Sequence, residues 1–323
     1  MAKGEFGRIA DYFAPLANGF PSAYGLQDDA ATISMASGRT LVVTTDTIVE
    51  GVHYLGNESP ATLARKLLRV SLSDLAAMGA VARAYTLNIA LGDSVSDAWV
   101  KDFCGGLRQD QSEFGIHLIG GDSVSTNGPL VLTATLFGEI DEARVLRRSG
   151  ACPGDSIFVS GTLGDGALGL LAARDELAEV DKGDIEFLSN RYRLPQPRID
   201  LGQSLVGIST AAADISDGLL ADLRHICGAS GVGAEVVLGD LPLSSAAKRV
   251  LEIRPHLAPL IATGGDDYEL VFTVPKSKVN QISAQKLDVQ IVCIGTVVEG
   301  KGVRALDSVG SEVSFARMGF RHN

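Results

Sequence analysis

The sequence is poor in the residues that build thiolate metal sites and disulfide frameworks. Its four cysteines, Cys104, Cys152, Cys227 and Cys293, lie far apart and form no C-x-x-C pair. Thiolate zinc sites and disulfide scaffolds are therefore poorly supported. This cysteine usage is typical of a reducing compartment, and we expect a cytoplasmic protein.

Long apolar runs and basic stripes are also missing. No stretch approaches ~18 uncharged apolar residues, so no membrane-spanning helix is predicted. Lys and Arg total 28 against 39 Asp and Glu, which gives a formal charge of −11. We therefore expect neither a membrane nor a nucleic acid as a partner. An acidic protein that handles phosphates must bring in cations, because its own field repels the ligand.

Two common nucleotide-binding frameworks are absent. The sequence contains no GxxxxGK[ST] loop, and the HRD and DFG motifs of protein kinases are missing. No Ser-His-Asp order stands out among the five histidines. A nucleotide site in this chain would therefore have a different construction.

Length and patterning predict two domains. The 323 residues, 46% of them hydrophobic, exceed the usual size of a single core. Strand and helix patterns predict a mixed α/β domain over residues 1–147, including a strand that ends at Asp46 and a strand that leads into the turn at Asp122. Turn residues cluster at 148–155, and the pattern beyond them predicts an α+β sandwich over 148–323, with helices on one side of a sheet.

Aspartates recur where predicted strands pass into loops, and one more lies in an apolar helix. The set is Asp29, Asp46, Asp74, Asp122, Asp214 and Asp217. Each alone has a plain explanation as a turn or capping residue. If several converge, each pair ~4 Å apart costs about 4 kcal/mol at an effective dielectric constant near 20. The set therefore predicts bound cations.

The ligand types favour magnesium. Oxygen ligands without paired His or Cys suit Mg²⁺ before Ca²⁺ or Zn²⁺, and the hydroxyls and carbonyls of Thr44 and Thr45 could add ligands. Glycine-rich turns at 120–123, 161–169, 216–218 and 263–267 offer backbone N–H groups for phosphates. Together these features suggest a nucleoside triphosphate.

Two further residues are candidates for contact with a ligand. His53 is the histidine best placed for such a contact, and the alternative is a loop histidine bonded to the backbone. Phe320 either anchors the tail or stacks on a ligand.

Ten stretches, in order, carry a resemblance that covers nearly the whole chain. They are GEF, DDAATI, TTDTIVEGVHY, SLSDLAAMGA, LIGGDS, RSGACPGD, GTLGDGALGL, ADISDGLLADL, GGDDYELVFTVP and a GF near the end. With these motifs the chain resembles the thiamine-monophosphate kinases. That family belongs to the PurM-like superfamily of aminoimidazole ribonucleotide synthetase and selenophosphate synthetase.

The resemblance implies a set of site residues and an assembly. The implied Mg²⁺ ligands are Asp29, Thr44, Thr45, Asp46, Asp74, Asp122, Asp214 and Asp217. The implied ATP contacts are Gly121, Asp122, Arg148 and Ser216, and the implied thiamine monophosphate contacts are His53, Asp266 and Phe320. Catalysis would depend on Asp46, Asp122, Asp217 and Arg148. The implied fold has an N-terminal α/β domain whose mixed sheet pairs with that of a second subunit, so a homodimer is expected.

The chain departs from the family pattern at three positions. Gln27 stands where the family usually has Gly, Asp266 where it usually has Glu, and Ser123 where Thr is more common. The first affects a left-handed turn before the paired aspartates. The second shortens a substrate contact by one methylene.

The implied reaction is ATP plus thiamine monophosphate giving ADP plus thiamine diphosphate. The acceptor oxygen is already anionic near neutral pH, so metal charge and positioning should do most of the catalysis. Two alternatives stay open. One is another superfamily enzyme, although no reactive Cys lies near the N-terminus, as selenophosphate synthetase requires, and VEGVHY and DISDGL fit the kinase better than aminoimidazole ribonucleotide synthetase. The other is a catalytically idle nucleotide- or metal-binding protein.

Overall fold

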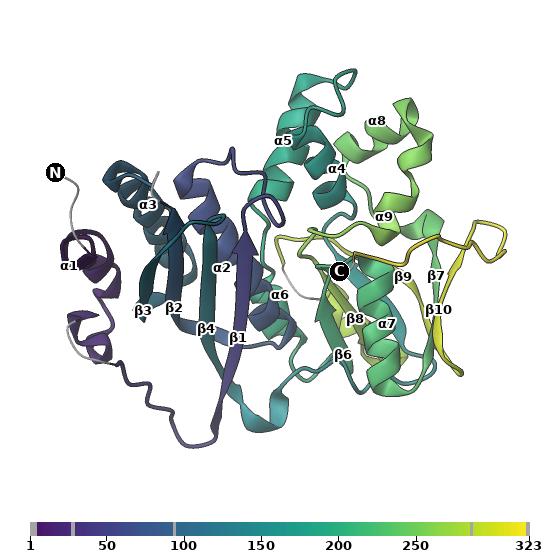
Figure 1. The fold of residues 1–323 in the computed structure, drawn as a ribbon. Coiled ribbons are helices and arrows are strands. Elements are labelled where there is room, and N and C mark those ends of the chain that lie inside the picture. Colours follow the sequence, from purple (N-terminus) through teal and green to yellow (C-terminus); the bar gives the residue numbers. More distant parts are fainter. Residues whose placement is uncertain (1–4, 27–29, 93–94, 285–286, 321–323) are drawn as a thin grey trace. The chain divides into compact units, whose positions relative to one another are not determined.

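The computed structural model describes residues 5–26, 30–92, 95–284 and 287–320 (Figure 1). These fall into two compact units. Unit 1 comprises Met1–Leu75 with Ala80–Ala143, and unit 2 comprises Ala76–Gly79 with Arg144–Asn323. The predicted boundary between residues 147 and 148 differs from this division by a few residues, and the short segment 76–79 groups with unit 2.

Unit 1 is built on a mixed four-stranded sheet of order β1-β4-β2-β3. The strands are β1 (Arg39–Val49), β2 (Val81–Gly92), β3 (His117–Thr126) and β4 (Val131–Asp141). β2 and β3 are parallel, whereas β4 pairs antiparallel with both β1 and β2. Helices α2 (Pro60–Ala77) and α3 (Asp97–Phe114) cover one face of this sheet (Figure 1).

The N-terminal segment of unit 1 contacts β3 and α3. It comprises α1 (Glu5–Arg8), a π-helical turn (Ile9–Phe13) and two 3₁₀ turns (Ala14–Ala17 and Pro21–Leu26). The predicted helix breaks near Pro15 because proline cannot donate a backbone hydrogen bond, and the chain there tightens into the first 3₁₀ turn.

Local signals explain where the helices of unit 1 lie. Along β4 every second residue is buried, from Leu132 to Ile140, so one face of the sheet packs under the helices. Ser96 caps α3 by accepting a hydrogen bond from the Trp99 N–H at 3.1 Å, and Gly115 ends it with a φ of 66°.

Between the helices, the buried Arg69 donates to both oxygens of the buried Asp110, at 2.8 and 3.0 Å. This bidentate pair compensates two charges that would be costly to bury alone.

Two predicted strand ends are wrong. β1 continues to Val49 and β3 to Thr126, so Asp46 and Asp122 lie inside strands. The extension of β1 is paired, because Thr47 lies opposite Thr133 and their hydroxyls hydrogen-bond at 2.8 Å. Threonine is β-branched and fits an exposed strand position, so the polar sequence did not mark a strand end.

Unit 2 is built on a six-stranded sheet of order β10-β7-β9-β5-β8-β6. Its strands are β5 (Ser156–Ser160), β6 (Ala211–Asp214), β7 (Gly233–Val237), β8 (Leu270–Val274), β9 (Ile291–Val298) and β10 (Gly302–Leu306). β10 and β7 are parallel and the other pairs antiparallel. The helices are α4 (Asp165–Ala173), α5 (Lys182–Arg193), α6 (Ile199–Leu205), α7 (Leu219–Ser230), α8 (Ser245–Ile253), α9 (Pro259–Thr263) and α10 (Val279–Ser283).

Helices cover both faces of this sheet, not the single side predicted. Ile157 of β5 packs in a core with residues of α4 and α7, whereas its neighbour Phe158 packs in a second core with Leu201 and Leu205 of α6. All five residues of β8 are buried. A strand buried on both faces reads as a continuous apolar run, so local sequence does not say how many layers cover it.

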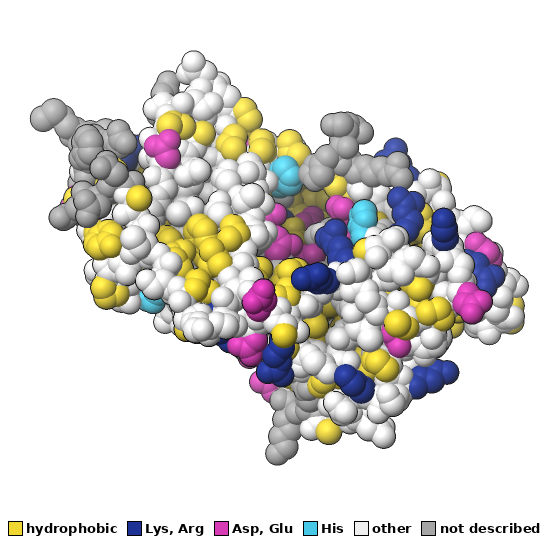
Figure 2. All heavy atoms as spheres, turned by 90° about the horizontal axis from the view of Figure 1, so that it is seen from below, with side chains coloured by type: hydrophobic (Ala, Val, Ile, Leu, Met, Phe, Trp, Pro, Cys, Tyr) yellow, Lys and Arg dark blue, Asp and Glu magenta, His cyan; other side chains and the backbone are white. Residues whose placement is uncertain are grey.

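Hydropathy along the described helices and charge on one face of the molecule can be compared with what a membrane or a nucleic acid would require. Among the described residues, no helix combines the length and the hydropathy that a bilayer crossing requires. On the face drawn in Figure 2, Lys and Arg side chains are interspersed with acidic and apolar ones instead of forming a continuous stripe.

The crossing of α2 and α3 is close enough to require glycine at one position. A Cβ at Gly106 would lie 2.2 Å from the Ala61 carbonyl oxygen, whereas a Cβ at the neighbouring Gly105 would meet nothing within 4 Å. We expect Gly106→Ala to lower the free energy of unfolding by about 1–3 kcal/mol through overpacking. Gly105→Ala should instead raise it by up to about 1 kcal/mol through helix propensity. Denaturant unfolding of both variants checks this; equal effects would contradict the packing.

Candidate active site

Three predicted site residues lie together where β1 packs on α2. Thr44 and Asp46 leave β1 on its α2-facing side, and the Thr44 hydroxyl donates a hydrogen bond to the Asp74 carboxylate on α2. Ser71, one turn before Asp74, hydrogen-bonds the Asp46 side chain. We call Thr44, Asp46 and Asp74 the β1–α2 carboxylate group.

Asp46 is incompletely satisfied within this group. Its Oδ2 is buried and has no hydrogen-bond partner among the described residues. Burial raises the pKa of Asp46, and the hydrogen bond with Ser71 opposes that shift. A buried carboxylate oxygen without a partner costs free energy, which a bound cation would recover. The donor set of carboxylates and a hydroxyl fits a hard divalent cation such as Mg²⁺.

The sheet separates Asp122 from this group. Asp46 stands on β1 and Asp122 on β3, the two opposite edges of the sheet. Three strand spacings put their backbones about 14 Å apart. Asp46 pairs with Ala134 of β4, whereas Asp122 pairs with Asn88 of β2, which in turn pairs with Thr133 of β4. Asp46 and Asp122 therefore lie in neighbouring rows of residues across the sheet. Side chains of neighbouring rows point to opposite faces of a sheet. One chain therefore does not bring these two carboxylates to a common ion.

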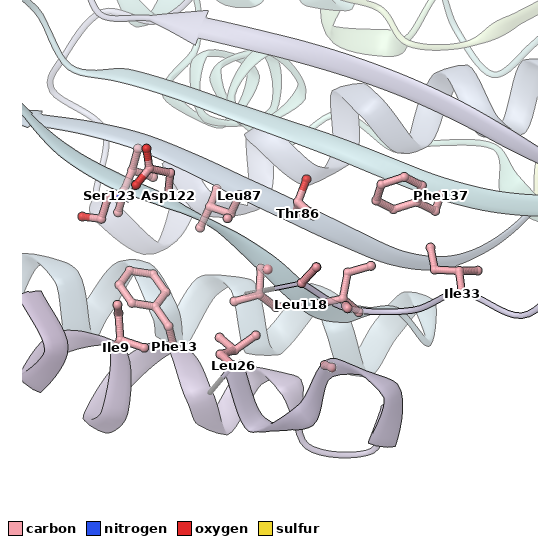
Figure 3. A pocket seen from close by; sticks show the side chains of 17 residues that line it. Ile9, Phe13, Leu26, Ile33, Thr86, Leu87, Leu118, Asp122, Ser123 and Phe137 are labelled. Carbon is pink, nitrogen blue, oxygen red and sulfur yellow. Dashed lines mark hydrogen bonds between the residues drawn. The ribbon is translucent and has the colours of Figure 1, made fainter. Parts of the chain in front are cut away.

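Asp122 and Gly121 instead border a cavity of about 530 Å³ in unit 1 (Figure 3). Asp122 and Ser123 form its polar end, and Asp122 Oδ1 accepts a hydrogen bond from the Ser123 N–H at 2.8 Å. Most of the other lining is apolar and includes Ile9, Phe13, Leu26, Ile33, Leu118 and Phe137. Gly121 has a φ of 150°, and a Cβ there would lie 1.9 Å from the Leu87 carbonyl oxygen, so the position requires glycine.

Two other predicted residues of unit 1 are bonded to the protein itself. The Thr45 hydroxyl faces away from Asp46; it donates to the Ala134 carbonyl at 3.3 Å and accepts from the Thr135 hydroxyl at 3.0 Å. A metal-binding role for Thr45 would fall to its main-chain carbonyl. His53 Nδ1 accepts the Val49 N–H at 3.1 Å, so the neutral ring carries its proton on Nε2. Asp29 and the departure at Gln27 lie outside the described residues.

In unit 2 the turn 216–218 brings several predicted residues together. Asp222, on α7 and buried, accepts with Oδ2 the N–H groups of Ser216, Asp217 and Gly218, each at 3.1 Å. Burial, and after it the charge of Asp217, raise the pKa of Asp222 to about 7. The hydrogen bonds from the Asp217 and Gly218 N–H groups and the charge of Arg148 oppose this rise. The exposed Arg148 therefore interacts electrostatically with the carboxylate that holds this turn.

The carbonyl groups of the same turn hold two further predicted residues. The Asp266 N–H donates to the Ser216 carbonyl and the Phe320 N–H to the Asp217 carbonyl, both at 2.9 Å. Asp266 adopts a left-handed φ of 68°, while the Phe320 side chain stays 52% exposed. Asp214, at the end of β6, is buried just before the turn. The backbone bond of Phe320 thus anchors the tail to the turn.

A second glycine-rich turn is also satisfied internally. The buried Asp267 accepts the Gly164 N–H at 2.7 Å and the Gly166 N–H at 2.8 Å. At both turns the N–H groups that the sequence offered to phosphates therefore bind carboxylates of the protein. These five N–H groups are therefore not free to bind phosphate, because each is already engaged by a buried carboxylate.

Sequence reasoning did not single out Asp222, whereas it predicted His225 to be a surface helix residue, and His225 is exposed on α7. Asp217, Asp222 and His225 each place one possible ligand atom within 4.8 Å of the other two. Asp222 and His225 are three residues apart on α7 and so lie on one face of the helix. An aspartate five residues after Asp217, near the start of a predicted helix, was the available signal in the sequence. The role of Asp222 was not predicted because its side chain binds backbone N–H groups, which a sequence motif does not reveal.

Comparison with known proteins identifies the class. Residues 27–140 match the N-terminal domain and residues 152–308 the C-terminal domain of the AIR synthase related proteins. The chain is thus of this two-domain, PurM-like class, and the predicted α/β and α+β architecture is confirmed.

The closer likenesses are to one enzyme family. The thiamine-monophosphate kinase of Caulobacter vibrioides is 42% identical over 323 residues, covering 98% of this chain and 90% of that protein. The thiamine-monophosphate kinase structure from Stenotrophomonas maltophilia is 39% identical with a TM-score of 0.80, covering 87% of this chain and 89% of that one. AaThiL complexed with AMPPCP and TMP is 31% identical with a TM-score of 0.79, covering 90% of each chain. The chain belongs to the thiamine-monophosphate kinase family.

The unpartnered Oδ2 of Asp46 gives a stability prediction. In EDTA near pH 7, Asp46→Asn should raise the free energy of unfolding by about 1–3 kcal/mol, because a buried charge without a partner is replaced by a neutral amide. Saturating Mg²⁺ should stabilise the wild type and leave the variant nearly unchanged. Thermal unfolding with and without Mg²⁺ measures both effects. A variant less stable than the wild type in EDTA would contradict this account of Asp46.

Proposed function

We propose that this protein transfers the γ-phosphoryl group of ATP to thiamine monophosphate and releases thiamine diphosphate and ADP. The observation that carries the proposal is the buried Asp46 Oδ2, which has no hydrogen-bond partner in the part of the chain that the structure describes and lies beside Thr44 and Asp74. Family membership supports the choice of substrates, as does the similarity to AaThiL complexed with AMPPCP and TMP.

The proposed metal ligands are the oxygen donors predicted from the sequence. They are Asp29, Thr44, Thr45, Asp46, Asp74, Asp122, Asp214 and Asp217. Bound Mg²⁺ would neutralise phosphate charge and so allow two anions to approach. The residues of the chain hold these charges in fixed positions, which is the larger part of catalysis when the acceptor oxygen is already anionic.

The remaining proposed contacts bind and orient the two substrates. Gly121, Asp122, Arg148 and Ser216 would contact ATP, with the Arg148 guanidinium bracing its phosphates. His53, Asp266 and Phe320 would contact thiamine monophosphate. The Phe320 ring offers a stacking surface, and His53 can donate from Nε2 because Nδ1 is engaged by the backbone. Since the turns at 164–166 and 216–218 bind internal carboxylates, phosphate charge must be met by cations.

We also propose that the protein is a homodimer joined through the face of the unit 1 sheet opposite α2. Leu41 and Val43 of β1 are 39% and 53% exposed on that face. Placing a second sheet against it would bury them and could bring β3 of the partner toward β1. This arrangement would give Asp46 and Asp122, separated within one chain, a way to serve one site. The cytoplasmic location remains a prediction from cysteine usage.

The proposed reaction is tested by following ADP and thiamine diphosphate. With ATP and Mg²⁺, ADP should form only when thiamine monophosphate is present, in equal amount with thiamine diphosphate. Asp46→Asn should lower kcat by about 100-fold or more, the effect of losing one electrostatic contact to the transition state. The matched control Asp240→Asn changes an exposed aspartate and should keep normal turnover. Absence of ADP would favour an idle binding protein, and ADP formation without the acceptor another superfamily reaction.

The dimer is tested by charging its proposed interface. Val43→Arg should give a monomer in sedimentation, because a desolvated guanidinium without a partner is costly. Val309→Arg, at a site 82% exposed in unit 2, should leave the dimer intact. If Asp46 and Asp122 serve one site across the dimer, mixed dimers of Asp46→Asn and Asp122→Asn chains should regain part of the activity that each lacks alone. A wild-type monomer would refute the dimer.

A further inference from the structure

The turn 216–218 connects most of the proposed site residues of unit 2. It carries Ser216 and Asp217, and its carbonyl groups accept the N–H groups of Asp266 and Phe320. Its own three N–H groups converge on a single atom, Asp222 Oδ2. Removing that atom would therefore change the shape of a turn on which four proposed contacts depend.

We propose that Asp222 is a positioning residue for phosphoryl transfer, acting on ATP, metal and acceptor through the turn 216–218. The inference rests on the proposed function. Asp222 is 2% exposed, and none of the substrate contacts proposed above involves its side chain. Its part is to hold the backbone that presents the contacts of Ser216, Asp217, Asp266 and Phe320.

The turn needs a buried acceptor to keep its shape. Three N–H groups that point at one spot form an anion-binding nest, and buried donors of this kind are almost always paired. Gly218 adopts a φ of 122°, and a Cβ there would lie 2.8 Å from the Thr263 backbone, so the turn is tightly packed on its far side. Without an acceptor, the three donors would have to turn toward water or recruit another anion.

The charge of Asp222 is well matched to the turn it holds. A carboxylate accepts several N–H groups more strongly than a neutral oxygen does. Leucine has a similar size but no acceptor, and asparagine keeps one acceptor oxygen without the charge. The two substitutions therefore separate hydrogen-bond acceptance from simple space filling.

The matched control is Asp184→Asn. Asp184 is also a buried aspartate of unit 2, 5% exposed, but it pairs with Arg249 between α5 and α8 and does not contact the turn. Its loss should lower thermal stability without changing the site. A variant at Asp222 that acts only on stability would behave in the same way.

The test compares wild type, Asp222→Asn, Asp222→Leu and Asp184→Asn in four measurements. These are the thermal unfolding temperature, the KM for thiamine monophosphate, the Mg²⁺ concentration for half-maximal activity, and calorimetric binding of AMPPCP in the presence of Mg²⁺. We expect Asp222→Leu to raise the KM and the Mg²⁺ requirement by about tenfold or more. This is the usual effect of removing a residue that positions the ligand-contacting groups without touching the ligand itself. Asp222→Asn should show a smaller shift in the same direction, and Asp184→Asn none.

Unchanged KM, Mg²⁺ requirement and AMPPCP binding in a folded Asp222 variant would overturn the proposal. Should Asp222→Leu fail to fold, the nearly isosteric Asp222→Asn decides the question by the same readouts. AMPPCP binding also keeps this test separate from the proposed function. A wild type that binds AMPPCP with Mg²⁺ but does not phosphorylate thiamine monophosphate would refute the reaction, and the calorimetric comparison would still judge Asp222.

Discussion

The part of unit 2 that carries the proposed site residues depends on buried carboxylates that occupy backbone anion nests. Asp222 takes three N–H groups of one turn and Asp267 two N–H groups of another. Glycine-rich turns usually suggest backbone donors aimed at phosphate, but here those donors have internal partners. In a chain with a net charge of −11, this leaves side-chain and metal cations as the source of positive charge for a polyphosphate.

Asp46 shows the opposite condition. Its Oδ2 is buried and accepts no hydrogen bond from the described residues, whereas Asp222 and Asp267 each accept several. Carboxylates that support the backbone are thus satisfied by the fold, and the one beside Thr44 and Asp74 is left for a ligand to satisfy. If Asp46 binds a cation as proposed, this difference fits a general pattern in which functional positions lower the stability of the unliganded protein.

Much of the fold was readable from the sequence because its signals were local. The helix from Pro60, the strand that ends at Asp214 and the mixed α and β content all follow from residue spacing. The layering of unit 2 was not readable, because Ile157 and Phe158 are equally apolar and only their packing partners differ. The separation of Asp46 from Asp122 depends on strand order, which no stretch of sequence contains. Asp222 escaped notice because its partners are main-chain groups, which every residue type shares.

The bond between the Phe320 N–H and the Asp217 carbonyl joins positions 103 residues apart. A ribosome that has just made the turn must go on translating for roughly 5–20 s, at about 5–20 residues per second, before the second partner exists. Until then a nascent chain has the turn without the backbone N–H group that the Asp217 carbonyl accepts. The tail can therefore be fastened to the turn only late in the folding of unit 2.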